Sequence, residues 1–227
     1  MNRGMLLIAF FTLLLFGRLV VADAYQDYLH NPTAKTAFAY LHEATTHQRC
    51  VNCHGAIEGN SQRPLVGEDS HVHPMNISSA NNLVLKVEGN KFIKAPNSTQ
   101  PVNCGGCHLD ANGTVIGMPP GAANDLMPGF VWHMPPPTMI LSRDMTPQQL
   151  CDNWLDPAKN SFLAIRGGRD DLVTFEKEFV HHVRDDPLIR WAWEPGPGRT
   201  PAPGAHKDFV KAMQLWISKG AKCPDQT

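Results

Sequence analysis

The sequence predicts a mainly helical fold with extensive coil. Three segments, within 34–44, 172–183 and 209–216, carry apolar residues at the spacing of a helix that buries one face. The 227-residue chain also contains 19 Pro and 18 Gly, a composition that favours long irregular connections between helices. A chain of this length forms one domain or two small ones. We expect one compact unit.

The first 24 residues have the pattern of an export signal. Arg3 gives a positive start, 5–16 is an apolar run apart from Thr12, and 22–24 places small residues where a signal is cleaved. A membrane-spanning helix needs about 20 residues, so this run is short for that role, although a retained anchor is the alternative. We expect a mature periplasmic chain, 25–227, with no stable membrane span.

The first predicted element of the mature chain is a helix. Asn31 is expected as its N-cap and Pro32 as its first residue, and apolar residues then recur from Ala34 to Ala44. Further on, the stretches 83–87 and 91–95 flank Gly89 and predict a small β-hairpin.

The second half of the chain predicts three more helices. Thr146 is a candidate N-cap, Pro147 suits the first helical position, and Gln149 completes a capping box. This helix should end near Asp156. The helices over 172–183 and 209–216 follow, and Gly220 is a suitable stop for the last one.

Two copies of the pattern Cys-x-x-Cys-His dominate the sequence. This is the attachment pattern of c-type haem: two thiols, two residues apart, each add to one porphyrin vinyl group, and the adjacent imidazole binds iron. A redox dithiol or part of a zinc site is the alternative, but a dithiol needs no trailing histidine and a four-cysteine zinc site uses neither histidine. The first motif contains Cys50, Cys53 and His54, and the second contains Cys104, Cys107 and His108.

The two motifs predict cytochrome c-like helices around two covalent haems. They lie 54 residues apart, which is short for two complete small-cytochrome domains in tandem. We expect a single domain over 25–227. Within it, a first-haem segment covers about 31–95, and a second-haem segment with the helical C-terminal part covers about 96–227.

The distal ligand decides whether a haem iron transfers electrons or has an open position for chemistry. For the second haem the first choice is Met134, in a Met-Pro loop before a capped helix, with His133 beside it as the alternative. For the first haem, His73 and Met75 are equally good choices and His71 comes next. These assignments stay open at this stage, because a methionine in an apolar loop also serves as a packing residue.

Four other side chains are candidates for a chemical role. Cys151 and Cys223 remain after the two motifs, and in an exported chain a disulfide between them is the favoured interpretation. The alternative is that one of them is a thiolate ligand of a haem. His181 and His182 lie on the 172–183 helix, where we expect them to face solvent or haem propionates.

Several stretches of the sequence resemble those of a known family. Besides the two motifs, the stretches 71–76, 132–137, 186–193 and 195–203 are similar to small bacterial dihaem cytochromes labelled as isoquinoline 1-oxidoreductase subunits. The resemblance covers most of 40–225. It implies a protein that accepts electrons from a periplasmic molybdopterin hydroxylase acting on aldehydes or N-heterocycles.

The combined features predict a periplasmic electron-transfer protein with a redox partner on each side. Its donor would be a dehydrogenase, and its acceptor a downstream cytochrome or oxidase. With 20 basic and 21 acidic residues, the chain lacks the basic footprint of a nucleic-acid-binding protein. The alternative functions are a haem enzyme, such as a peroxidase or a thiosulfate-oxidising cytochrome, and a haem-based sensor. An enzyme of this kind would need an open iron position.

Overall fold

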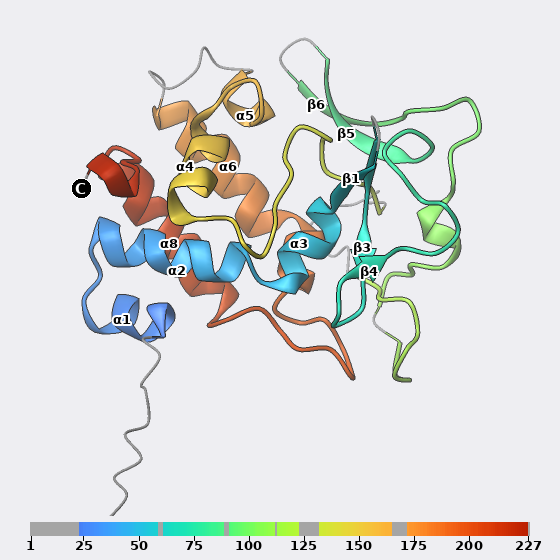
Figure 1. The fold of residues 1–227 in the computed structure, drawn as a ribbon, viewed down its shortest axis with the longest axis horizontal. Helices are drawn as coiled ribbons and strands as arrows, with labels where there is room; N and C mark the ends of the chain where they lie inside the picture. The colour runs from blue at the N-terminus through green and yellow to red at the C-terminus, as the bar shows by residue number, and fades with distance from the viewer. Residues whose placement is uncertain are drawn as a thin grey trace, which may run out of the picture.

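The computed structural model describes residues 23–58, 61–88, 91–111, 113–122, 132–164 and 172–226. The predicted signal, 1–24, lies outside the described residues except for its last two positions. In the described part, helices occupy one end of the molecule and three antiparallel strand pairs the other, with α3 at the junction (Figure 1). The prediction of a mainly helical chain with extensive coil is confirmed. None of the described helices has the length and apolar character needed to cross a bilayer.

The elements follow one another in three groups. An N-terminal group of helices leads into the strands, and the remaining helices close the chain. The helices are α1 (Ala24–His30), α2 (Ala34–Thr45), α3 (Gln48–His54), α4 (Pro147–Leu155), α5 (Ser161–Ala164), α6 (Leu172–Asp185), α7 (Pro187–Trp191) and α8 (His206–Ser218), with the short 3₁₀ helices η1 (Cys104–Gly106) and η2 (Pro224–Gln226). The strand pairs are β1 (Ala56–Glu58) with β2 (Ser61–Arg63), β3 (Leu65–Val66) with β4 (His71–Val72), and β5 (Leu83–Glu88) with β6 (Lys91–Pro96).

The predicted N-cap of α4 is confirmed, and that of α2 is wrong. The side chains of Thr146 and Gln149 form the predicted capping box, and α4 ends before Asp156. The predicted cap of α2 was wrong: Thr33, not Asn31, is the N-cap. Thr33 forms its own capping box with Thr36, which satisfies two backbone N–H groups.

The predicted hairpin is confirmed and runs from Leu83 to Pro96. A third segment joins its edge, because the N–H of Met134 donates to the carbonyl of Leu83 at 2.9 Å and the N–H of Leu85 donates to the carbonyl of Met134 at 3.0 Å. These two bonds fix the backbone of Met134 against β5, on the route from the second motif to α4.

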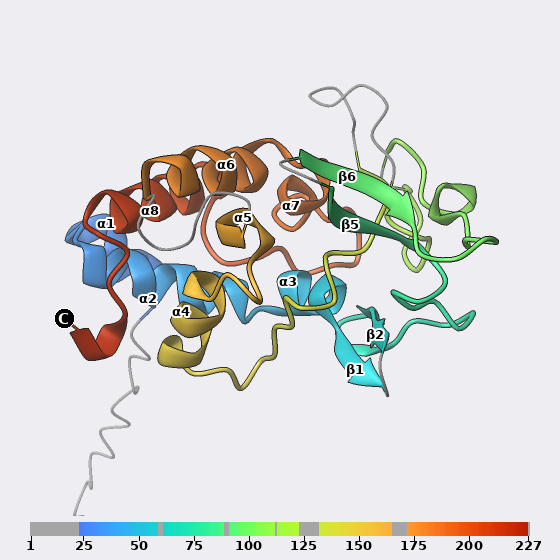
Figure 2. The same cartoon turned by 90° about the horizontal axis from the view of Figure 1, so that it is seen from above.

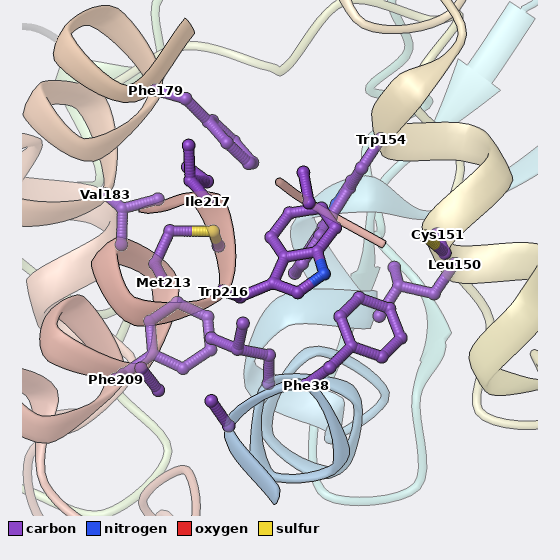
Figure 3. Close-up of a cluster of buried hydrophobic side chains, with 14 of the residues drawn as sticks. Phe38, Leu150, Cys151, Trp154, Phe179, Val183, Phe209, Met213, Trp216 and Ile217 are labelled. Carbon is purple, nitrogen blue, oxygen red and sulfur yellow. The ribbon is translucent and has the colours of Figure 1, made fainter. Parts of the chain in front are cut away.

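The hydrophobic core lies between α2, α4, α6 and α8. Trp216, on α8, is fully buried, and its ring centroid lies 5.1 Å from that of Phe38 and 5.8 Å from that of Trp154 (Figure 3). The indole N–H donates to the carbonyl of Lys222 at 2.9 Å, so the buried polar group is satisfied. The helical stripes predicted for 172–183 and 209–216 therefore face this core.

A disulfide joins Cys151 on α4 to Cys223 after α8, with an S–S distance of 2.07 Å. Both side chains are fully buried. The bond holds the C-terminal tail to the helical end of the molecule, and it takes both remaining thiols out of consideration as haem ligands.

Replacing both Cys151 and Cys223 by alanine should lower the free energy of unfolding by about 2–4 kcal/mol. The bond spans 72 residues, so its loss gives the unfolded chain much more conformational freedom. Urea denaturation followed by circular dichroism measures the change. Lys222→Ala, beside Cys223 but exposed, is the control and should stay within about 0.5 kcal/mol of the parent. An unchanged midpoint in the double variant would contradict the expectation.

Candidate functional site

The first motif lies on α3, which puts its reactive side chains on one side of the helix. Residues three and four positions apart share a helix face, so Cys50, Cys53 and His54 line the same cavity. The helix stops at Gly55, where φ is +29° and a Cβ atom would lie 1.9 Å from the carbonyl oxygen of Arg63. A glycine is therefore required directly after His54.

The cavity beside the first motif opens into the hydrophobic core. Its volume is about 140 Å³, and most of the side chains that line it are apolar. Its walls include Trp154, Phe179, Phe209 and Met213 from α4, α6 and α8. The predicted first-haem segment, 31–95, supplies only part of this lining.

His54 is held as a neutral imidazole with one free nitrogen. Its Nδ1 lies 2.8 Å from the carbonyl oxygen of Met139, and because a carbonyl only accepts, Nδ1 carries the hydrogen. Burial lowers the pKa of His54 to about 4, although the bond to Met139 opposes the shift. The lone pair of Nε2 is therefore available to a metal.

The two thiols beside His54 are protonated at neutral pH. Burial raises the pKa of Cys50 to about 12 and that of Cys53 to about 11. A redox dithiol and a zinc site both use thiolates, so this environment favours neither. In the described part of the chain, no three His, Cys, Asp or Glu side chains converge as ligands for a metal ion.

A buried carboxylate and two histidines also line the first cavity. Asp186 lies between them: its Oδ2 is 3.4 Å from Nδ1 of His182 and 4.0 Å from Nε2 of His133, and all three residues line the cavity. Burial alone would raise the pKa of Asp186, but the hydrogen bond to His182 and the charges of both histidines hold it at about 2. No sequence pattern predicted this group, although the i, i+4 spacing of His182 and Asp186 is a signal that the sequence contains.

The second motif lies at the strand end of the molecule, in the light green segment of Figure 2. It forms η1, where the Asn103 side chain caps the N–H of Gly105. The thiol of Cys104 donates to Oδ1 of Asn82 at 3.1 Å, and Cys107 is exposed. Cys107 is therefore closer to the surface than Cys50, Cys53 and Cys104, which are all partly buried.

His108 repeats the arrangement of His54. Its Nδ1 lies 2.8 Å from the carbonyl oxygen of Pro120, and burial lowers its pKa. The indole of Trp132 stacks on the face of the imidazole, with ring centroids 4.1 Å apart and planes at 27°. In both motifs, then, a backbone carbonyl fixes Nδ1 and leaves Nε2 free.

Four exposed apolar side chains follow the second motif in the sequence. They are Leu109, Val115, Ile116 and Met118, and Ile116 is 75% exposed. Leu109 directly follows His108, so at least this exposed apolar side chain lies next to the motif in the chain.

The predicted distal ligands are distributed differently from expectation. Met134, assigned to the second haem, is buried with Ile77 and Val84 because its backbone pairs with β5. His133 lines the cavity of the first motif. His73, assigned to the first haem, lies beside His108, with ring centroids 6.3 Å apart.

The other two candidates from this stretch point to solvent. His71 is exposed and its Nδ1 lies 2.7 Å from Oδ1 of Asp69, while Met75 is 71% exposed. Of the two histidines on α6, His181 is exposed and pairs with Asp185, as expected, whereas His182 is turned into the first cavity.

Buried polar atoms without a hydrogen-bond partner in the described part of the chain occur at both sites. Thr45 Oγ1 is one of them, on a residue that lines the first cavity. At the second site they are Trp132 Nε1, on the ring stacked on His108, and Asn82 Nδ2, on the side chain that contacts Cys104. A ligand with polar substituents at its edge would supply such partners.

No protein-family model, curated protein or solved structure significantly matches this chain, so its function is inferred from the two motifs and their surroundings.

Proposed function

We propose that this chain is a dihaem c-type cytochrome of the periplasm that transfers single electrons from a dehydrogenase to the respiratory chain. The family resemblance of the sequence suggests a molybdopterin hydroxylase as one such dehydrogenase. One observation carries the proposal. Both motif histidines direct Nδ1 to a backbone carbonyl, Met139 at 2.8 Å and Pro120 at 2.8 Å, and this is how a metal-binding histidine is oriented with Nε2 toward the metal.

The residues at the first motif fit a haem. Cys50 and Cys53 border a largely apolar cavity, and both are protonated thiols. Each thiol would add across one vinyl double bond, sulfur to one carbon and hydrogen to the other, so no oxidant or reductant is consumed. His54 would bind the iron through Nε2, and the aromatic walls would exclude water.

The residues at the second motif fit a haem in a more exposed position. Cys104 and Cys107 would form the thioether bonds, and His108 would bind the iron through Nε2. Trp132 would hold the imidazole plane by stacking on its face. When bound, each haem supplies an iron that gains or loses one electron, and burial and axial ligands set its potential. A buried site and an exposed site in one chain support an electron relay with one end open to a partner.

Counting haems tests the proposal. The chain should be produced in a periplasm that contains the haem-attachment machinery and then examined by intact-mass spectrometry. We expect two haem equivalents on each polypeptide, resistant to acid–acetone extraction. A redox titration followed at the haem bands should need two electrons per chain. A colourless product that binds zinc would contradict the proposal, and turnover of peroxide or thiosulfate would favour an enzyme instead.

A further inference from the structure

We propose that His73 and His108 bind the same iron from opposite sides, which gives the second haem two histidine ligands. The inference rests on the proposed function, because it concerns the coordination of the haem attached at the second motif. It assigns His73 to the second haem, whereas the sequence alone grouped the 71–75 stretch with the first.

The distance between the two rings carries the inference. A metal–imidazole bond is about 2.0 Å long and a ring nitrogen lies about 1.2 Å from the ring centre, so two imidazoles on one metal have centroids about 6.4 Å apart. The centroids of His73 and His108 are 6.3 Å apart. The interplanar angle of 47° is compatible with this, because each ring can rotate about the shared axis through the metal.

In both rings a hydrogen bond to a backbone carbonyl determines which nitrogen carries the hydrogen. Nδ1 of His73 lies 2.6 Å from the carbonyl oxygen of Pro74, as Nδ1 of His108 lies 2.8 Å from that of Pro120. Because both carbonyls only accept, both Nδ1 atoms carry hydrogen and both Nε2 atoms keep a lone pair. Trp132 covers a face of the His108 ring, which leaves the Nε2 edge open.

The backbone holds His73 where it is. The residue directly follows β4, which pairs with β3, and its own N–H donates to the carbonyl of Pro64 at 2.9 Å. The strand pair therefore fixes the start of the turn that presents the imidazole. Three of the other predicted donors are placed differently: His71 and Met75 are exposed, and Met134 is packed in its own apolar cluster.

The test compares His73→Ala with His71→Ala in the full chain carrying its haems. Both variants should keep two haem equivalents. In His73→Ala, one of the two haems should become high-spin and should bind one CO per chain when reduced, while His71→Ala should match the parent. Added imidazole should restore the low-spin spectrum of His73→Ala, and His73→Met should raise the midpoint potential of one haem.

The outcomes separate this inference from the proposed function. If the parent chain carries two haems and His73→Ala stays fully low-spin without binding CO, the inference is wrong and the proposed function stands. If the parent carries no haem, the proposed function fails first. Should His73→Ala fold poorly, His73→Met decides: an unchanged spectrum and potential in that variant would also overturn the inference.

Discussion

Trp216→Ala is expected to lower the free energy of unfolding by about 3–5 kcal/mol, the range for removing a large buried aromatic side chain. Trp216 is fully buried and contacts the rings of Phe38 and Trp154, so its loss leaves a cavity between α2, α4 and α8 that rigid neighbours fill poorly. It also leaves the carbonyl of Lys222 without its indole donor. For a chain of this size the melting temperature should fall by roughly 10 °C.

Chemical denaturation of the haem-loaded protein measures this change, and Gln214→Ala is the matched control. Gln214 lies on the same helix, two residues away, and is exposed, so its replacement should change the free energy of unfolding by less than about 0.5 kcal/mol. A loss below about 1 kcal/mol in Trp216→Ala would mean that the tryptophan is not at the centre of the core.

The features that the sequence predicted well are local ones. The capping box of Thr146 and Gln149 depends on residues three positions apart, and the hairpin of Leu83–Glu88 with Lys91–Pro96 depends on two short stretches that flank Gly89 in the sequence. The stripes on α6 and α8 follow in the same way from helical spacing. The two Cys-x-x-Cys-His motifs are also local, since each needs only five consecutive residues, but haem attachment at them stays a prediction.

The features that the sequence did not reveal depend on contacts between distant segments. Met134 is predicted as a ligand from its loop, and only the structure shows that its backbone adds to the edge of β5 and that its side chain packs with Val84. His73 reaches His108 because β4 pairs with β3 and positions the following turn. No periodicity within either segment indicates such a pairing, because the distances are set by the tertiary fold.

The group at Asp186 is an intermediate case. Its spacing from His182 is a helical i, i+4 pair, which the sequence contains. However, whether such a pair faces solvent or a cavity depends on what packs against α6. The adjacent His181 also has an i, i+4 partner, Asp185, but its side chain is exposed. Sequence patterns could identify the pair but not the direction in which it points.

The contrast between the two motifs leads to the second large expected effect. Replacing both Cys50 and Cys53 by alanine should remove one haem equivalent and lower the free energy of unfolding by at least about 3 kcal/mol, as for an unfilled cavity in a core. Core side chains such as Trp154, Phe179 and Met213 line that cavity, so without a covalently held ligand they lose their packing partner.

The equivalent replacement of Cys104 and Cys107 should also remove one haem equivalent but cost less than about 1.5 kcal/mol, since exposed side chains are tolerant to change. Cys107 is exposed and Cys104 is partly buried, and neither is among the residues that line the core cavity, so a haem there would lie nearer the surface. Mass spectrometry gives the haem count, and denaturation gives the free energy of unfolding of each double variant.

The control is the same pair of double variants produced without haem attachment. There only the thiols are lost, so the two double variants should be nearly equally stable. If both haem-loaded double variants lost the same free energy of unfolding, the placement of the first haem in the core would be contradicted. A ligand bound inside the core should stabilise the folded state more than one bound near the surface.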